Sequence, residues 1–264
     1  MRRLLMTVLA AAFAVSAASA QSLKFQTFAD SVGIKQKGVP TYSAVTVAYP
    51  VDGPAALVKS IKTTFSERYQ IPMASITDGK TFANKLANKN VANLKKKFVE
   101  DFDQDDNIPE LYINNTIEKV YETDKIVTVM YGGNVFYGGA HDDYFAAGVT
   151  FRKSDGKVLD TYDILDEDAW DQIQDKVAAS LRKYFDVDSN KELADELIDD
   201  GIICEDNNFF IFMPANPPYV ENGELVFLYS TYEIAPFAAG MPEVRIPLKE
   251  ITQFLDPDFA PLVK

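Results

Sequence analysis

Cysteine is nearly absent from this sequence, since Cys204 is the only one in 264 residues. A single cysteine excludes an internal disulfide framework, a cysteine zinc cluster and a CxxC redox pair. Stability must therefore come from a packed core. With 47% hydrophobic residues, a chain of this length has enough apolar side chains for one substantial core or two closely joined ones.

Histidine is equally scarce, because His141 is the only one. Catalytic zinc sites generally draw on several histidines or cysteines, so the composition disfavours zinc, and no cofactor is expected. No GxSxG elbow exists for an acyl-transfer nucleophile, and Ser154 lies in a predicted hairpin turn. Cys204 ends the apolar part of GIICEDNN just before two acids, which opposes thiolate formation and predicts a buried or inert side chain. A carboxylate pair for glycoside hydrolysis stays open, because acids are plentiful and nothing singles out two of them.

Long apolar runs are absent after the first twenty residues. Those residues are typical of an export signal, with a basic start at Arg2 and Arg3, an apolar run at Leu4–Val15 and a small-residue cleavage site at Ala18–Ala20. The run is too short to span a bilayer as an ordinary helix. We therefore predict an exported protein, periplasmic or extracellular, that starts at Gln21 and has neither a lipid anchor nor a membrane span.

Basic residues are in deficit, with 26 against 39 acidic ones and a formal net charge of −13. Removal of residues 1–20 leaves 24 basic residues against 39 acidic ones, a charge of −15. Such a charge disfavours nucleic acid and anionic membranes and favours basic partners or cations, although solubility alone explains many acidic surfaces. The run DFDQDD, Asp101–Asp106, starts like a calcium loop. An EF-hand needs glycine sixth and glutamate twelfth, where Asp106 and Tyr112 stand, so a solvated acidic loop is expected.

Hydrophobic periodicity is the strongest signal that is present. It predicts a strand at Tyr42–Tyr49 and a helix that starts after Pro54. A second helix is predicted from about 80 to 102, and ELADELIDD is predicted to be helical as far as Gly201. Apolar residues recur at helical spacing in a third, clearest helix: Trp170, Ile173, Val177, Leu181 and Tyr184. Further strands are predicted at 111–121, 125–131, 134–137, 144–153, 208–213, 224–232 and 244–247, followed by a short helix before Asp256.

This order of elements predicts an α+β fold, with a mostly antiparallel sheet and helices packed on one side. The chain has neither a low-complexity linker nor a repeat at a fixed period. We therefore expect two closely associated lobes, residues 21–150 and 151–264, with the boundary near Phe151.

Aromatic residues are abundant, with 13 tyrosines and 18 phenylalanines. Tyrosine combines an apolar ring with a polar tip, which suits both sheet packing and exposed recognition surfaces. Core packing accounts for most of these residues. The tyrosines near predicted loops are the candidates to face a partner: Tyr137, Tyr144, Tyr219 and Tyr232.

Two stretches resemble the signatures of an exported domain of unknown function. The first is YGGAHDDYFAAGVTFRKSDGKVLDTYDIL, Tyr137–Leu165, with a Gly-Gly-Ala-His turn and an Asp-Gly-Lys hairpin. The second is ELVFLYSTYEIAPFAAGMPEVRIPLKEITQFL, Glu224–Leu255, with Tyr-Glu-Ile-Ala-Pro and a terminal Ile-Pro strand. The domain forms the ectodomain of RsiV-type anti-sigma factors and the non-catalytic amino-terminal region of PdaC-type peptidoglycan deacetylases. The segment Phe212–Gly223 looks longer than the usual connection in this domain.

The resemblance implies a non-enzymatic binding or sensing module of the cell envelope. A basic envelope-active protein such as lysozyme is the expected partner; peptidoglycan fragments are the alternative, and a hydrolase with an unrecognised site is the third reading. Gly138 and Gly139 are expected to form a bend that aims His141, with a structural role favoured over ligand contact. A hydrogen bond from His141 to Glu233 would join the two signatures. The expected binding or motif residues, with no catalytic or metal site, are Tyr137, Gly138, Gly139, His141, Tyr144, Tyr232, Glu233 and Pro236.

Overall fold

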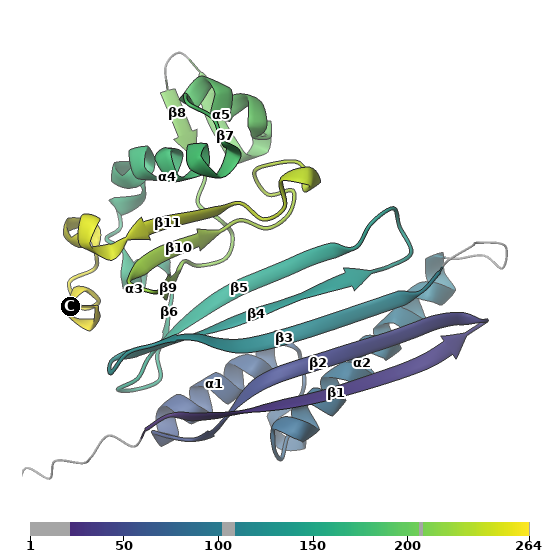
Figure 1. Ribbon diagram of the computed structural model, residues 1–264. Helices are drawn as coiled ribbons and strands as arrows, with labels where there is room; N and C mark the ends of the chain where they lie inside the picture. Colours follow the sequence, from purple (N-terminus) through teal and green to yellow (C-terminus); the bar gives the residue numbers. More distant parts are fainter. Residues whose placement is uncertain (1–21, 102–108, 206–207, 264) are drawn as a thin grey trace, which may run out of the picture.

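The computed structural model describes residues 22–101, 109–205 and 208–263. The expected export signal and nearly all of the acidic run after Asp101 lie outside these residues. Four layers make up the molecule: a pair of helices, a large sheet, a small sheet and a second group of helices (Figure 1). The predicted α+β class, with a mostly antiparallel sheet and helices on one side, is confirmed.

The large sheet has six strands in sequence order: β1 (Lys24–Gln36), β2 (Val39–Asp52), β3 (Leu111–Glu122), β4 (Ile126–Phe136), β5 (Asp143–Arg152) and β6 (Val158–Leu159). All neighbours are antiparallel except β2 and β3, which are parallel. A parallel pair needs a long crossover, and the two helices between β2 and β3 provide it. The predicted strands 125–131 and 134–137 form the single strand β4. Glycine at position 133 permits the close approach of β4 to β3, because a Cβ there would lie 2.0 Å from the Asn114 carbonyl oxygen.

Two helices, α1 (Ala55–Arg68) and α2 (Gly79–Asp101), cover one face of the large sheet (Figure 1). The helix predicted after Pro54 is confirmed as α1, and one side of it packs on the sheet, since Leu57, Ile61 and Phe65 are fully buried. Phe65 packs edge-on to Tyr131 of β4 with ring centroids 5.6 Å apart. Burial of one such side chain contributes about 1.5–3 kcal/mol, so this apolar contact holds the helices on the sheet.

The small sheet covers the other face of the large one. Its order is β11 (Glu243–Pro247), β10 (Glu224–Leu228) and β9 (Tyr219–Glu221), all antiparallel. Side chains of β10 alternate: Leu225 and Phe227 join a core with α4, whereas Val226 and Leu228 pack with Met130 of the large sheet. The central strand β10 is therefore apolar on both faces between Leu225 and Leu228.

The second group of helices comprises α4 (Ala169–Phe185) and α5 (Asn190–Glu196), with the hairpin of β7 (Ile202–Glu205) and β8 (Asn208–Ile211) beside α5, whereas the short α3 (Thr161–Ile164) lies next to β6 and β9 (Figure 1). The predicted stripe of α4 is buried as far as Leu181, but Tyr184 is exposed and donates a hydrogen bond to the Ala239 carbonyl. Short 3-10 turns complete the chain: η1 (Met73–Ser75), η2 (Asp199–Gly201), η3 (Phe237–Ala239), η4 (Leu248–Glu250), η5 (Thr252–Phe254) and η6 (Ala260–Leu262).

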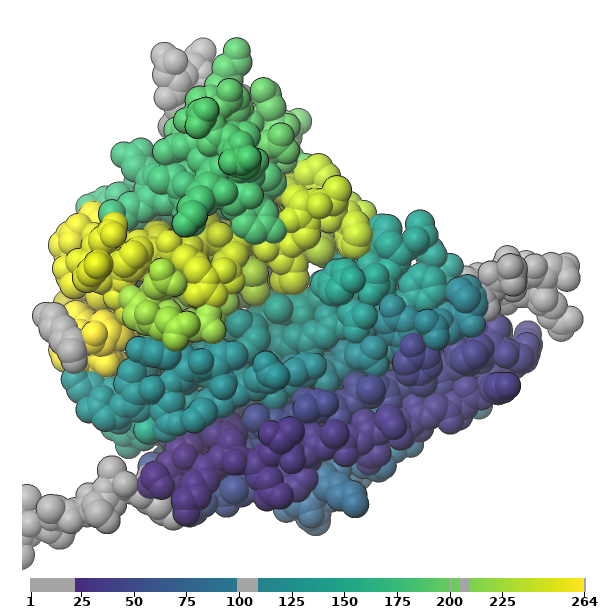
Figure 2. Space-filling view, viewed as in Figure 1, coloured from purple at the N-terminus to yellow at the C-terminus, as the bar shows by residue number. Residues whose placement is uncertain are grey.

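The two sheets are joined by buried polar contacts as well as by apolar packing. The Thr128 hydroxyl donates to the Val220 carbonyl at 2.6 Å, and the Val220 N–H donates to the Thr150 hydroxyl at 2.9 Å. The C-terminal segments lie directly on the central strands in the space-filling view (Figure 2). The boundary expected near Phe151 falls inside β5, and the large sheet continues to Leu159, so the division into lobes remains a prediction.

Candidate functional site

The β4–β5 hairpin tip carries the first predicted signature. Its bend requires a glycine at position 138, where φ is +86°, a conformation that L side chains rarely adopt. Gly139 does not have a positive φ, and a Cβ there would meet nothing within 4 Å. Only one of the two glycines expected to have unusual angles therefore has them.

His141 lies on this tip and stacks on a ring from the second signature. Its imidazole is 3.7 Å from the ring centroid of Phe237, with 21° between the planes, and its Nδ1 lies 3.0 Å from the Asp142 carbonyl oxygen. Phe237 starts η3 directly after Pro236, and the exposed Tyr232 ring is 5.6 Å from it. The two signatures therefore meet through aromatic stacking between the β4–β5 hairpin tip and η3.

The expected hydrogen bond between the His141 imidazole and the Glu233 carboxylate is not formed. The Glu233 carboxylate instead accepts hydrogen bonds from the backbone N–H groups of Ala215 and Ser230, both at 2.6 Å. Glu233 thus ties its own loop to the Phe212–Gly223 connection, whose last residues form β9 and the turn to β10. That connection, expected to be longer than usual, has a structural task because it delivers a strand to the small sheet.

Asp142 is the polar centre of the tip, although sequence reasoning singled out only its neighbour. Its carboxylate accepts hydrogen bonds from the Asn134 amide at 3.0 Å, the Tyr112 hydroxyl at 3.2 Å and the Tyr144 hydroxyl at 3.3 Å. These donors, Asn134 first, hold the pKa of Asp142 below its usual value, so the carboxylate is ionised at neutral pH. The same charge raises the pKa of the Tyr144 hydroxyl.

An aromatic row crosses the strands next to Asp142. Tyr42, Tyr112 and Phe136 are register partners on β2, β3 and β4, with successive ring centroids 5.4 and 5.8 Å apart. A row of amides follows, in which Asn114 donates to Asn134 at 3.2 Å. Alternation puts both rows on the sheet face opposite α1 and α2. Their residues lie in predicted strands, but only cross-strand register brings them together, and periodicity does not specify register.

Three of the four tyrosines proposed as partner-facing are exposed. Tyr137, Tyr144 and Tyr232 have 40%, 50% and 58% of their surface accessible, and the Lys97 ammonium lies 5.0 Å from the Tyr137 ring centroid. Tyr219 is 1% exposed, so its proposed role in recognition is wrong. It starts β9 and fills the space above Gly148, where a Cβ would lie 2.2 Å from its ring.

The other chemistry-bearing candidates lie away from the tip. Cys204 is exposed on β7, so the expectation of a buried thiol is wrong; the two-stranded hairpin leaves that side uncovered. Among the described residues, no three histidine, cysteine or carboxylate side chains are placed to hold a metal ion. Nor does any helix in the described ranges have the length and apolarity needed to cross a membrane.

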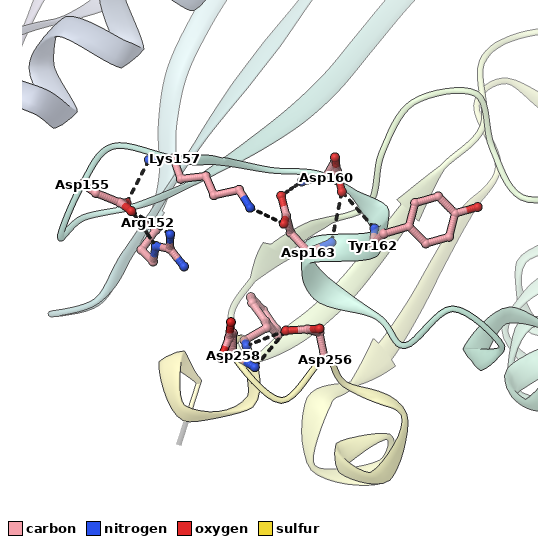
Figure 3. A network of polar contacts seen from close by, with 9 residues as sticks. Arg152, Asp155, Lys157, Asp160, Tyr162, Asp163, Asp256 and Asp258 are labelled. Carbon is pink, nitrogen blue, oxygen red and sulfur yellow. Dashed lines mark hydrogen bonds and ion pairs between the residues drawn. The ribbon is translucent and has the colours of Figure 1, made fainter.

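The predicted Asp-Gly-Lys hairpin is the core of a separate polar network (Figure 3). The Arg152 guanidinium binds Asp155 through Nε at 3.0 Å and Nη2 at 2.6 Å, and the Lys157 ammonium pairs with Asp163. These groups border a small cavity of about 100 Å³ that also touches Asp256 and Asp258. The contacts fasten the hairpin to α3 and place it next to the C-terminal turns, which indicates a structural role.

Part of the second half matches a family of known sequences. Residues 162–249 match DUF3298, "Protein of unknown function". This DUF3298 region runs from α3 to just past β11 and contains Tyr232, Glu233, Pro236 and Phe237. It supports the expected domain of unknown function in its coarser form, whereas the link to RsiV-type and PdaC-type proteins stays an interpretation.

Solved structures extend the similarity to nearly the whole chain. A DUF3298 family member from Bacteroides fragilis NCTC 9343 has a TM-score of 0.73 at 17% identity, covering 93% of this chain and 98% of its own. A DUF3298 family protein from Pseudomonas aeruginosa PAO1 has a TM-score of 0.58 at 14% identity, covering 90% and 96%. At such identities the similarity establishes the fold alone. No curated protein matches the sequence.

Proposed function

We propose that this protein is an exported, non-enzymatic binding module that captures a basic protein of the cell envelope, with lysozyme as the concrete example. The observation that carries the proposal is the exposed surface where the hairpin tip meets the loop before η3. It combines the exposed rings of Tyr144 and Tyr232 with the carboxylates of Asp142 and Asp143. Tyrosines beside carboxylates suit a cationic protein surface, because rings supply contact area and acids pair with lysine and arginine.

This surface is organised before a partner arrives. Three donors fix the Asp142 carboxylate, and the Thr231 hydroxyl donates to Asp143 at 2.9 Å across the two lobes. The stack of His141 on Phe237 fixes the relative positions of tip and loop. A preorganised surface loses less conformational entropy on binding than a mobile one, which favours recognition.

Charge outside the surface supports the same class of partner. Residues 160–200 carry fourteen acidic residues against four basic ones. Such a field accelerates encounter with a cationic protein and is screened at high ionic strength. Export is inferred from residues 1–20, which lie outside the described part of the chain.

A binding role also fits His141 better than catalysis does. Its ring is occupied by the stack on Phe237, and its Nδ1 is next to a backbone carbonyl. Cys204 is on β7, at the far side of the second lobe from the hairpin tip (Figure 1). Neither side chain has the nucleophile–base geometry of covalent catalysis.

Calorimetric titration of residues 21–264 with a basic lysozyme tests the proposal. We expect a stoichiometric complex that weakens as salt rises from about 0.05 to about 0.2 M. Tyr232→Ala should weaken it by roughly ten- to a hundred-fold if Tyr232 is a hot spot. Tyr162→Ala is the matched control, because Tyr162 is 67% exposed but lies on α3, and it should leave affinity unchanged.

Absence of a complex, or equal loss in both variants, would contradict lysozyme capture at this surface. The second candidate is a glycan-binding module, which the row of Tyr42, Tyr112 and Phe136 favours because aromatic rings stack on sugar faces. In that case insoluble peptidoglycan should retain the protein, and Tyr112→Ala should release it while Tyr162→Ala does not. Release of product from either ligand would instead indicate a hydrolase.

A further inference from the structure

The net negative charge hides a segregation of charge between the layers. Residues 55–98, which include α1 and nearly all of α2, contain nine lysines and arginines against two acids, and α2 then ends with Glu100 and Asp101. Most of the acids among residues 160–200 fall on or next to α4 and α5, which lie beyond both sheets (Figure 1). A protein with a net charge of −13 therefore presents one basic helical face.

Exposed cations are spread over this face. Lys59, Arg68, Lys80 and Lys95 are exposed and Lys85 is partly exposed, although the Arg68 guanidinium also lies 4.8 Å from the Tyr131 ring centroid. None of these five forms a salt bridge with a described residue, whereas on the opposite lobe lysines and arginines do pair with acids, as Lys176 does with Glu250. Intramolecular ion pairs thus do not account for the basic face.

The two acids of the segment do little to offset these cations. The Asp78 carboxylate accepts a hydrogen bond at 2.7 Å from the Thr81 N–H in the first turn of α2. It therefore satisfies a helix N-terminus, where a negative charge is favourable. Glu67 is exposed and close in sequence to Arg68. Lys59, Lys80, Lys85 and Lys95 therefore remain available to a partner, whereas the Lys89 ammonium donates to the Tyr69 carbonyl at 2.7 Å.

The shape and composition of the face favour a lipid surface over a polymer. α2 has 23 residues and is about 34 Å long, so its cations are spread along an extended helix rather than gathered in a groove. Lysines predominate, and they bind anions as point charges without the bidentate geometry of arginine. Met73 is the one exposed large apolar side chain between residues 55 and 98, so the face lacks the aromatic platforms that single-stranded nucleic acid needs.

Long-range repulsion by the acidic lobe does not prevent such docking. The layers of helices and sheets are spaced by about 10 Å, so α4 lies about 30 Å from the basic face. The Debye length is about 8 Å at physiological ionic strength. When α1 and α2 contact an anionic surface, the acidic helices are too distant to repel it. An approach with the acidic helices toward the surface is repelled, and this difference selects the orientation.

We propose that the outer face of α1 and α2 docks this protein on an anionic phospholipid surface, with the acidic lobe directed away from the lipid. Binding is electrostatic and peripheral. The face is separate from the surface at the hairpin tip, so this inference does not depend on lysozyme capture.

Sedimentation with vesicles tests the docking. The protein used for this experiment spans residues 21–264. It contains every described residue and omits the apolar run Leu4–Val15, which would itself bind lipid. We expect binding to phosphatidylcholine vesicles that contain about 30% phosphatidylglycerol, no binding to pure phosphatidylcholine, and release at about 1 M salt. Combined Lys80→Gln, Lys85→Gln and Lys95→Gln should lower partitioning by about a hundred-fold, since each lysine near an anionic surface contributes roughly a five-fold gain.

A matched variant removes the same charge from the acidic lobe. Lys183→Gln, Lys191→Gln and Lys249→Gln change three exposed lysines outside the basic face and should leave vesicle binding unchanged. Equal loss of vesicle binding in both triple variants would mean that binding depends on net charge and not on the basic face, and it would overturn the proposal. Failure to bind anionic vesicles would overturn it as well, and so would binding to duplex DNA or polyphosphate without binding to vesicles.

Discussion

Gly148 lies at a point of close packing between the two sheets. It is buried on β5, and a Cβ there would lie 2.2 Å from Cγ of Tyr219. Gly148→Ala forces the Tyr219 ring, which is 1% exposed, out of its place. We expect the free energy of unfolding to fall by about 1–3 kcal/mol, the usual cost of overpacking, as measured by urea denaturation.

Gly139→Ala is the control for this substitution. A Cβ at Gly139 meets no atom within 4 Å, and its φ is not positive. The change should be neutral or slightly stabilising, because alanine restricts the unfolded chain. If Gly148→Ala were as harmless as Gly139→Ala, close packing between the sheets would not be the reason for a glycine in β5.

At the level of single residues, the sequence draws attention to a residue that is rare. His141 was singled out by its rarity, and the structure puts it at a contact between the two signatures. Asp142, by contrast, is one of 39 acids. What distinguishes it is that its carboxylate accepts hydrogen bonds from three side chains on three strands. Its importance depends on register, which no local pattern encodes.

At the level of elements, the Asp155 hairpin gives a prediction that depends on pH. Arg152 and the Lys157 N–H bind the Asp155 carboxylate, and these contacts, Arg152 first, lower its pKa to about 2 (Figure 3). A lowered pKa in the folded state means that the stabilisation is complete above the unfolded value of about 4. It is lost as pH falls through about 2.

Asp155→Asn should therefore lower stability at neutral pH and lose this effect in acid. Because the pair is largely exposed, we expect only about 0.5 kcal/mol at pH 6, with a smaller difference from wild type near pH 2. Chemical denaturation at both pH values measures it. Asp124→Asn, at an exposed turn between β3 and β4, should show no difference at either pH. An effect of Asp155→Asn that is equal at both pH values would contradict a role for the ionised carboxylate.

The sequence predicts helices and strands where the apolar pattern extends over many residues or is strongly periodic. α1, α2 and α4 were placed within a few residues, because their apolar stripes face a sheet. β1, β7 and β9 were missed for different reasons. β1 is an edge strand with mixed exposure, whereas β7 and β9 have only four and three residues, too few to display alternation.

At the scale of the whole molecule, cooperation between the layers depends on how the sheets are joined. Apolar packing alone is adaptable, but the contacts among Thr128, Thr150 and Val220 are directional and completely buried. They connect the centre of the large sheet to β9, and through β9 to the small sheet and α4. We therefore expect the two lobes to unfold in one transition.

Thr150→Val tests this connection with little change of shape. The substitution leaves the buried Val220 N–H without its acceptor, and an unsatisfied buried donor costs about 1–3 kcal/mol. Thr46→Val makes the same chemical change on an exposed position of β2 and should alter stability by less than about 0.5 kcal/mol. Fluorescence of Trp170, the sole tryptophan, follows the lobe around α4, and far-ultraviolet circular dichroism follows the whole chain. Both signals should shift together in Thr150→Val, because the lost bond belongs to both sheets. Two separate transitions in the wild type would instead show that each lobe folds independently and that the buried threonines only align them.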